Sequence, residues 1–163
     1  MCIRDSVAAD EQALVTIRST PEVHARWRGD DLHAEFVENL ADDDVVRLAI
    51  VEPNGAVVGL IQFEEEPDHE YRHASVDIYV DPGWHRRGFA LDAINTVAHH
   101  LFTNGGHHRI TIDPAADNHA AIACYTKAGF VSVGVLREYE QQVDGSWGDG
   151  LLMELLKSDR HIS

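Results

Sequence analysis

The chain has 163 residues and a mass of 18.1 kDa, which favours one compact domain with its own hydrophobic core. Its 13 Lys and Arg residues stand against 28 Asp and Glu residues, so the formal net charge is −15. This charge argues against nucleic-acid binding, which depends on clustered cations, and favours cationic partners such as polyamines, amino sugars or basic peptides. An acidic surface that serves solubility alone explains the charge equally well.

Hydrophobic residues make up 44% of the chain and charged residues 25%, as in ordinary globular proteins. No apolar run reaches membrane-spanning length, and the first residues lack the basic and apolar regions of a secretory signal. We therefore expect a cytoplasmic protein without a membrane partner. The two cysteines, Cys2 and Cys124, lie far apart in the sequence, which argues against a disulfide framework and a thiolate zinc site.

The first 19 residues carry the weakest pattern, and we expect them to form a separate N-terminal segment. Residues 2–6 fit no regular element, and residues 7–18 fit either a frayed helix or a strand that ends at Ile17. Pro21 then predicts the first position of a short helix that carries Val23 and Trp27 on one face.

A second helix is predicted after Asp30 or Asp31, either of which can cap it. Leu32, Phe36 and Leu40 recur there at helical spacing. From residue 45 on, alternating or β-branched runs predict strands, and apolar residues at helical spacing predict two longer helices. The strands are expected over residues 45–51, 57–63, 75–80, 109–112, 130–139 and 147–156, and the helices over residues 88–103 and 118–128. This order predicts a mixed α/β (α+β) fold in one domain, residues 20–157, followed by a tail, residues 158–163.

A tight turn over residues 81–90 joins the third strand to the first long helix. Flexible residues such as Gly83 and Gly88 leave backbone N–H groups pointing outward, where the helix dipole adds positive charge. Arg86 and Arg87 supply formal positive charge in an otherwise acidic chain. The turn therefore predicts a pyrophosphate site, although a surface loop with two solvated arginines fits it too, because the strict three-glycine fingerprint is absent.

Two segments resemble the GNAT superfamily of acetyl-CoA-dependent N-acetyltransferases. Residues 113–130 resemble its "Asn, Ala, Tyr, Gly-Phe" segment, and residues 85–90, His-Arg-Arg-Gly-Phe-Ala, resemble its Gln/Arg-x-x-Gly-x-Gly/Ala pyrophosphate loop. The resemblance covers roughly residues 45–156. It implies a mostly antiparallel mixed sheet with a splayed central parallel pair, flanked by helices, and acetyl-CoA as co-substrate. His85 departs from the usual Gln or Arg, at small expected cost, because the loop binds through backbone N–H groups. The family's first strand is short or lost here, so we expect residues 1–6 to be extraneous or disordered.

The resemblance also implies roles for individual residues. The backbone N–H of Val80 would donate to the thioester carbonyl as an oxyanion donor. Asn118 would contact the pantetheine arm. The Tyr125 hydroxyl would protonate the leaving thiolate, and a helix tyrosine half-buried against the sheet is the alternative. The pyrophosphate would lie in the loop that contains His85, Arg86, Arg87, Gly88, Phe89 and Ala90.

Within the superfamily, residues 134–137 and 144–153 look most like the aminoglycoside 6'-N-acetyltransferases. In that group acidic side chains on the splayed strands bind the ammonium groups of the sugar; by position these are Asp77 and Asp113. Gln62 matches a polar substrate contact, and Trp27 an aromatic wall. The resemblance thus implies acetylation of an aminoglycoside 6'-amino group, hence antibiotic resistance, by a monomer or homodimer. Polyamine and ribosomal-protein acetyltransferases share much of this ending and stand as the alternative, as does a non-catalytic acyl-CoA-binding module.

Amine acetylation itself requires an acidic residue at such a site. A protonated amine is not a nucleophile, so the site must attract the cation and then accept its proton. Asp77 interrupts an apolar strand, where an unpartnered carboxylate would be costly, so it predicts a cationic ligand or a buried hydrogen-bond network. The alternative for Asp77 is a solvent-facing residue on an edge strand. The alternative for Asp113 is a residue of an Asp-Pro turn.

The charged and histidine-rich segments are expected to be solvated. Residues 64–68 predict a charged loop, with a rim of the acceptor cleft as the alternative. The pairs His99-His100 and His107-His108 place adjacent rings in different directions, and no carboxylate completes a site at ligand spacing. We therefore expect solvated histidines and no metal.

Overall fold

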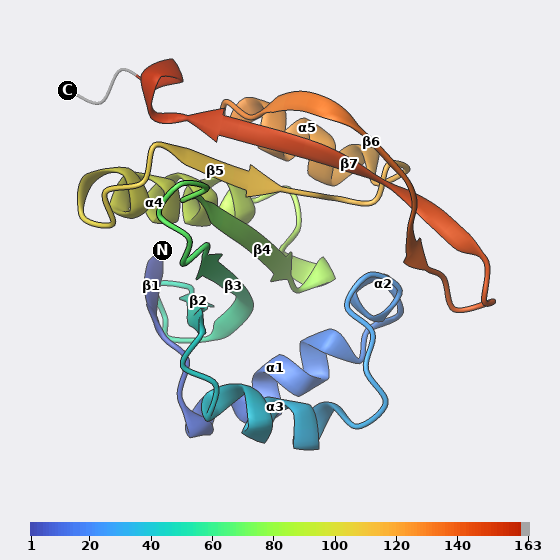
Figure 1. Ribbon diagram of the computed structural model, residues 1–163. Helices are drawn as coiled ribbons and strands as arrows, with labels where there is room; N and C mark the ends of the chain where they lie inside the picture. The colour runs from blue at the N-terminus through green and yellow to red at the C-terminus, as the bar shows by residue number, and fades with distance from the viewer. Residues whose placement is uncertain (161–163) are drawn as a thin grey trace. The chain divides into compact units, whose positions relative to one another are not determined.

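The computed structural model describes residues 1–160 and confirms the mixed α/β class. Its seven strands follow the order β1-β2-β3-β4-β5-β7-β6, in which β4 and β5 form the parallel pair (Figure 1). The strands are β1 (Cys2–Asp5), β2 (Val45–Val51), β3 (Val57–Glu65), β4 (Ala74–Val80), β5 (Arg109–Ile112), β6 (Val131–Gln141) and β7 (Trp147–Leu156). The helices are α1 (Glu11–Arg18), α2 (Pro21–His24), α3 (Leu32–Leu40), α4 (Phe89–Thr103) and α5 (His119–Lys127).

The chain divides into two compact units, which are described separately. Unit 1 comprises Met1–Glu64 and Asp77–Ala93, and unit 2 comprises Glu65–Val76 and the chain from Ile94 on. Strand β4 and helix α4 each contribute residues to both units. The tail expected over residues 158–163 begins within a short 3-10 turn, Lys157–Asp159, and residues 161–163 lie outside the described residues. No helix within residues 1–160 is long and apolar enough to cross a membrane.

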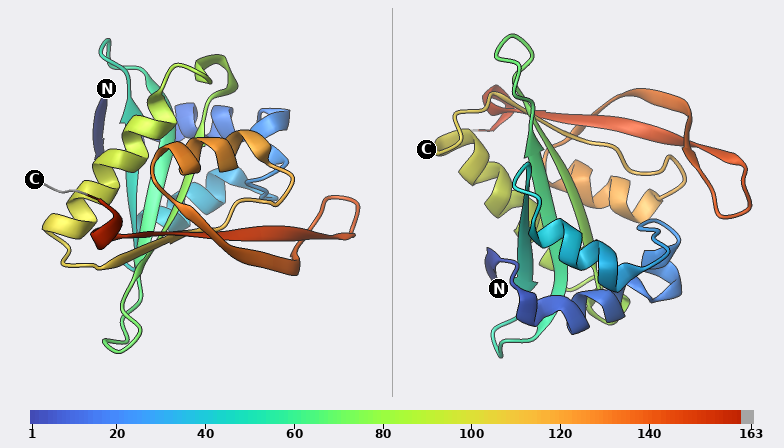
Figure 2. Two further views of the ribbon diagram at one scale, coloured as in Figure 1. Left: turned by 90° about the horizontal axis from the view of Figure 1, so that it is seen from above. Right: turned by 60° about the horizontal axis from the view of Figure 1, so that its bottom comes forward.

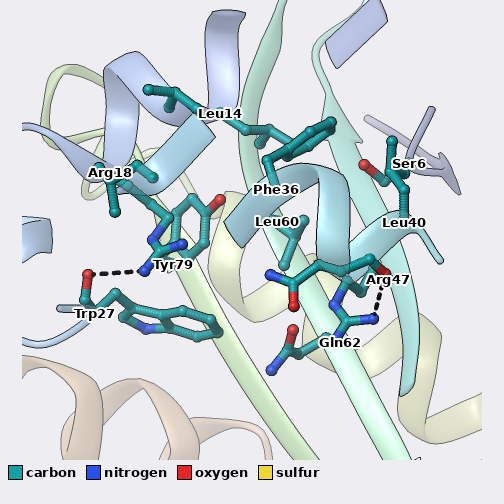
Figure 3. Close-up of a pocket in the computed structure, with 13 residues that line it drawn as sticks. Ser6, Leu14, Arg18, Trp27, Phe36, Leu40, Arg47, Leu60, Gln62 and Tyr79 are labelled. Carbon is teal, nitrogen blue, oxygen red and sulfur yellow. Dashed lines mark hydrogen bonds between the residues drawn. The ribbon is translucent and has the colours of Figure 1, made fainter. Parts of the chain in front are cut away.

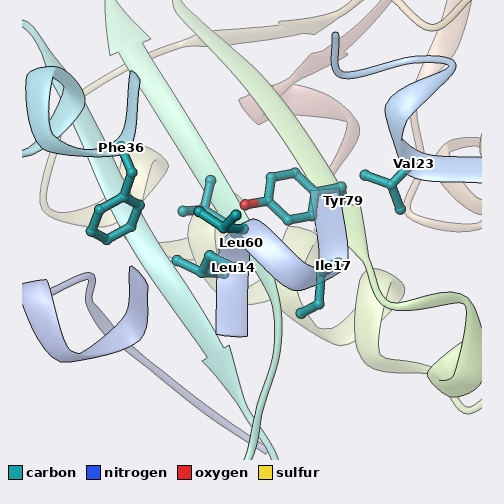
Figure 4. Packing of buried hydrophobic residues seen from close by; sticks show 7 residues of the cluster. Leu14, Ile17, Val23, Phe36, Leu60 and Tyr79 are labelled. Atoms are coloured by element: carbon teal, nitrogen blue, oxygen red, sulfur yellow. The ribbon is translucent and has the colours of Figure 1, made fainter. Parts of the chain in front are cut away.

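Unit 1 is a layer of helices packed on a small sheet. Strands β1, β2 and β3 pair antiparallel in sequence, and residues of α1, α2 and α3 form one apolar cluster with residues of β3 and β4 (Figure 4). The buried members of this cluster are Leu14, Val15, Ile17, Val23, Phe36, Leu60 and Tyr79. Burying these side chains fixes the helix layer over the strands that carry the candidate site.

The N-terminus differs from the sequence prediction. Residues 2–5 form β1, which pairs with β2 from Cys2↔Val51 to Asp5↔Leu48, although the sequence pattern of residues 2–6 indicated no regular element. The expectation that residues 1–6 are extraneous stays a prediction. Arg4 donates two 2.7 Å hydrogen bonds to the Asp10 carboxylate in the 3-10 turn Ala8–Asp10. The strand alternative for residues 15–17 is wrong, because they lie in α1. The secondary structure of residues 2–5 depends on pairing with residues of β2 that are more than 40 positions away in the sequence. No local sequence pattern reveals such partners.

Unit 2 contains the C-terminal strands and α5. The parallel ladder joins Ala74 to Ile110 and Ser75 to Thr111, and β7 pairs antiparallel with both β5 and β6. Figure 2 shows β6 and β7 as a long twisted ribbon. Helix α5 begins at His119, after its cap residue Asn118, and ends at Lys127, within one residue of the predicted range at each end; Gly129, with a φ of 99°, follows the cap residue Ala128. This left-handed residue is a common helix stop, because glycine adopts it without steric cost.

Candidate active site

The loop between β4 and α4 has the backbone expected of an anion site. The φ angle is positive at Arg86 (60°) and at Gly88 (87°), two residues apart. When the sign of φ changes between neighbouring residues in this way, successive N–H groups turn toward one side and form an anion-binding concavity. The Asp92 N–H donates to the Gly88 carbonyl at 2.9 Å, so the N–H groups of the preceding residues in the first turn have no acceptor within the helix. This backbone is compatible with the diphosphate site that the sequence predicts, and the binding role of the loop stays a prediction.

Aromatic packing holds the side chains of this loop. The Trp84 and Phe89 rings meet edge to face with centroids 5.5 Å apart, and the Arg87 Cζ lies 4.6 Å from the Trp84 ring centroid. This cation–π contact restrains a guanidinium that is otherwise exposed. The sequence prediction used Arg87 for its backbone and overlooked Trp84, although an aromatic residue three positions before an arginine was a visible signal.

His85 contacts the end of β4. Its Nε2 lies 2.9 Å from the Val80 carbonyl oxygen, and since a carbonyl only accepts, Nε2 carries the proton. The histidine that departs from the family pattern thus ties the loop to the last residue of the strand. The oxyanion role of the Val80 N–H stays a prediction.

A pocket in unit 1 brings together two residues that were predicted to contact the amine substrate. Trp27 and Gln62 both line one open pocket (Figure 3). Tyr79 lines it too, and its ring meets the Trp27 ring edge to face at a centroid distance of 4.8 Å. Burial raises the pKa of the Tyr79 hydroxyl, although the charge of Arg18 opposes this shift, so the hydroxyl stays protonated at neutral pH.

Two arginines that sequence reasoning missed also line this pocket. The side chains of Arg18 and Arg47 are only 12% and 13% exposed. The Arg47 Nη1 donates to the Asn39 carbonyl at 2.8 Å, and its Nη2 lies 3.0 Å from the Asp42 carboxylate. No local sequence signal distinguishes such a buried arginine from a solvated one, because these two hydrogen-bond acceptors lie outside its own strand.

Asp77 is exposed, which corrects one step of the sequence argument. The sequence argument inferred a cationic ligand or a buried hydrogen-bond network from the free-energy cost of burying the Asp77 carboxylate. An exposed carboxylate does not have this cost, so burial no longer supports the inference. Asp77 is the one exposed residue of β4, in which Ala74, Val76, Tyr79 and Val80 are buried. The role of Asp77 toward an amine stays a prediction that rests on charge and position alone.

The remaining candidates lie in unit 2. The Asn118 Oδ1 accepts the Ala121 N–H at 3.2 Å and caps α5, while Tyr125, 7% exposed, packs its ring against Phe130. The Tyr139 hydroxyl donates to the Asp113 carboxylate, a contact that the sequence did not predict. The proposed roles of Asn118, Tyr125 and Asp113 stay predictions.

One histidine differs from its prediction. His99, His100 and His108 are exposed as expected, but His107 is 1% exposed, and its Nε2 lies 2.9 Å from the Glu65 carboxylate. Gly106, with a φ of 68°, reverses the chain and brings the imidazole inward. In the part of the chain that the structure describes, no three His, Cys, Asp or Glu side chains are grouped as a metal site requires.

Comparison with known proteins adds the following similarities. The model of the acetyltransferase (GNAT) family matches residues 12–130. A spermidine N(1)-acetyltransferase of Vibrio cholerae serotype O1 is 28% identical over 129 residues, which are 79% of this chain and 73% of that protein.

Two solved structures are similar in fold. The spermidine N-acetyltransferase from Vibrio cholerae in complex with CoA and spermine has a TM-score of 0.83 at 24% identity, covering 97% of this chain and 96% of that one. The ribosomal-protein-S5-alanine acetyltransferase from Vibrio fischeri has a TM-score of 0.80 at 18% identity, covering 96% and 93%. At these identities the two structures establish the shared fold alone.

Proposed function

Because the chain belongs to the acetyltransferase (GNAT) family and is an N-acetyltransferase, we propose that it transfers the acetyl group of acetyl-CoA to a primary amine of a polyamine. The amine nitrogen forms a bond to the acetyl carbonyl carbon, and the thioester carbon–sulfur bond breaks. An ammonium nitrogen gives up two protons in all, one before it attacks and one after; the departing sulfur gains one, and the other passes to solvent. Acetyl-CoA supplies the activated acyl group, and the protein positions both reactants and handles the protons.

The observation that carries this proposal is the backbone of residues 86–90. Left-handed φ angles at Arg86 and Gly88, followed by the open first turn of α4, support a diphosphate site at these residues. The N–H groups of Arg87, Gly88, Phe89 and Ala90 would hold it, with Arg86 beside them. Acetyl-CoA carries such a diphosphate, and the Vibrio cholerae structure of the same fold contains CoA.

The charge of the chain and its relatives favour a polyamine as the acceptor. A net charge of −15 attracts polycations, and the relative that is 28% identical is named for spermidine. These observations favour the polyamine alternative over the aminoglycoside 6'-amino group that the C-terminal resemblance first implied. Aminoglycosides are polycations too, so charge alone does not separate the two acceptors.

The proposed chemical steps use three residues. Asp77 attracts the ammonium group and accepts its proton, directly or through water, which yields the neutral nucleophile. The Val80 N–H donates to the carbonyl oxygen as negative charge develops there. Tyr125, a buried residue, returns a proton to the sulfur.

Four further residues would hold the reactants. Asn118 would contact the pantetheine arm, and Asp113 would bind a second ammonium group of the polycation. Trp27 and Gln62 would form the aromatic and polar walls on the acceptor side, which their shared pocket supports.

Thiol release from acetyl-CoA tests the proposal. Spermidine, a kanamycin-type aminoglycoside and a basic peptide are offered in parallel at matched concentrations, and kcat/KM is compared. We expect spermidine to give the highest kcat/KM. A higher value for the aminoglycoside or the peptide contradicts the polyamine assignment. Acetyl-CoA binding without thiol release on any amine indicates the non-catalytic module.

A further inference from the structure

Trp27 lies on a connection with little regular structure. Residues 25–31, here called the acceptor loop, join α2 to α3 and contain no helix or strand. A loop of this kind holds an aromatic ring in one place only if contacts outside the loop fix its backbone. The structure contains such contacts on both sides of the loop.

Arg18, the last residue of α1, binds the loop from one side. Its Nη2 lies 2.6 Å from the Arg28 carbonyl oxygen and 3.4 Å from that of Trp27 (Figure 3). The same nitrogen lies 3.0 Å from the Glu35 Oε2. The guanidinium is 12% exposed, so water competes weakly for these hydrogen bonds.

Glu35, on the first turn of α3, binds the loop from the other side. Its Oε1 accepts the Asp30 N–H at 3.1 Å, while its Oε2 is paired with Arg18. The carboxylate also lies directly against Gly29, where a Cβ would come within 2.4 Å of both oxygens. The pair therefore holds two carbonyls and one N–H of residues 27–30.

These contacts hold the backbone of Trp27 from its carbonyl side, while its N–H donates to the Val23 carbonyl at 2.7 Å. With its carbonyl held near Arg18, the Trp27 indole meets Tyr79 edge to face and lines the pocket that Gln62 also lines. We propose that Arg18 and Glu35 are positioning residues for the acceptor: they fix the acceptor loop and so set the affinity for the amine. This inference rests on the proposed function in that Trp27 contacts the acceptor.

The chain offers a matched control pair elsewhere in unit 1. Arg4 likewise joins a carboxylate to a backbone carbonyl, donating to Asp10 at 2.7 Å and to the Asp5 carbonyl at 3.0 Å. It ties β1 to the turn Ala8–Asp10 and lines no part of the pocket. Replacing the guanidinium of Arg4 or of Arg18 removes a planar group that donates several hydrogen bonds, so either change destabilises unit 1. Only the Arg18–Glu35 pair holds the acceptor loop.

The test compares Arg18→Lys and Glu35→Gln with Arg4→Lys. For the first two, we expect the KM for spermidine to rise about tenfold and the KM for acetyl-CoA to change less than about twofold, because only acceptor groups move. Amide hydrogen exchange over residues 25–31 should speed up in these variants and not in Arg4→Lys. The inference is overturned if Arg4→Lys raises the spermidine KM as much, or if both KM values rise together.

Two further measurements keep the outcomes separate. Gly29→Ala displaces the Glu35 carboxylate without removing a charge, so it should reproduce the rise in acceptor KM even if Arg18→Lys does not fold. If the enzyme prefers the aminoglycoside, the proposed acceptor fails, and the positioning role is judged on the KM for that aminoglycoside. An enzyme that acetylates no amine in the panel overturns both proposals.

Discussion

Gly88→Ala tests the loop on which the proposed donor site depends. Gly88 has a φ of 87°, and a Cβ added there would meet nothing within 4 Å. The substitution therefore adds no steric contact, and its whole effect arises from the backbone conformation.

The magnitude follows from the left-handed conformation. Holding a residue with a Cβ in that region costs about 1–2 kcal/mol. If the free loop relaxes to a negative φ, bound acetyl-CoA must restore the original backbone, and this free energy is taken from binding. A cost of that size is a factor of about 5–30 in an equilibrium constant, so we expect the KM for acetyl-CoA to rise by that factor.

The assay is thiol release with acetyl-CoA varied at saturating spermidine, together with thermal unfolding. Gly55→Ala is the control, because Gly55 also lies in unit 1, has a φ of 98° and would likewise bring an added Cβ within 4 Å of nothing. Gly55 belongs to the turn between β2 and β3, outside the proposed site. We expect both variants to lose stability and only Gly88→Ala to weaken acetyl-CoA use.

The reasoning is refuted if the two glycine variants lose the same stability and show the same KM for acetyl-CoA. That result would mean that the left-handed backbone at Gly88 serves folding alone. The diphosphate assignment of residues 86–90 would then lose its structural support.

Three further predictions address other residues. Tyr125→Phe should lower kcat by about 10²-fold or more while acetyl-CoA binding, measured by calorimetry, stays nearly intact, because only the proton donor is removed; unchanged kcat excludes Tyr125 from the mechanism. Asp77→Asn should raise the KM for spermidine by about tenfold and leave that for acetyl-CoA nearly unchanged, because it removes one charge that attracts the amine; equal changes in both would indicate a structural role. Asp10→Asn should lower the free energy of unfolding at pH 7 by about 1–2 kcal/mol, since the Arg4 partner is partly exposed. The hydrogen bonds from Arg4 lower the pKa of Asp10 below its ordinary 3.8, so their stabilisation is present above that pH and is lost as the pH falls through the lowered value. Urea unfolding at pH 7 and below pH 3 should therefore show a difference between the two proteins that shrinks with acid; a constant difference would contradict this.

The element types were predictable because their signals are local. Alternating residues in β2 and β4, helical spacing in α3 and α4, and glycine at the end of α5 each depend on neighbours within a few positions. The Asp31 cap of α3, which accepts the Ala34 N–H at 3.0 Å, was one of two caps foreseen. The loop over residues 85–90, to which we assign the pyrophosphate, was recognisable for the same reason, since its glycine and arginines are contiguous.

The sequence by itself thus determined the order of strands and helices from residue 45 on, the acidic composition and the tight turn before α4. Only the tertiary structure decided that residues 2–5 form a strand, that the turn at Gly88 is left-handed, that His107 is buried against Glu65, that Asp77 is exposed and that Arg18 and Glu35 hold the acceptor loop. The physical reason is that periodicity and turn chemistry act between near neighbours. The burial and hydrogen-bond partners of a polar side chain are supplied by segments far away in the chain.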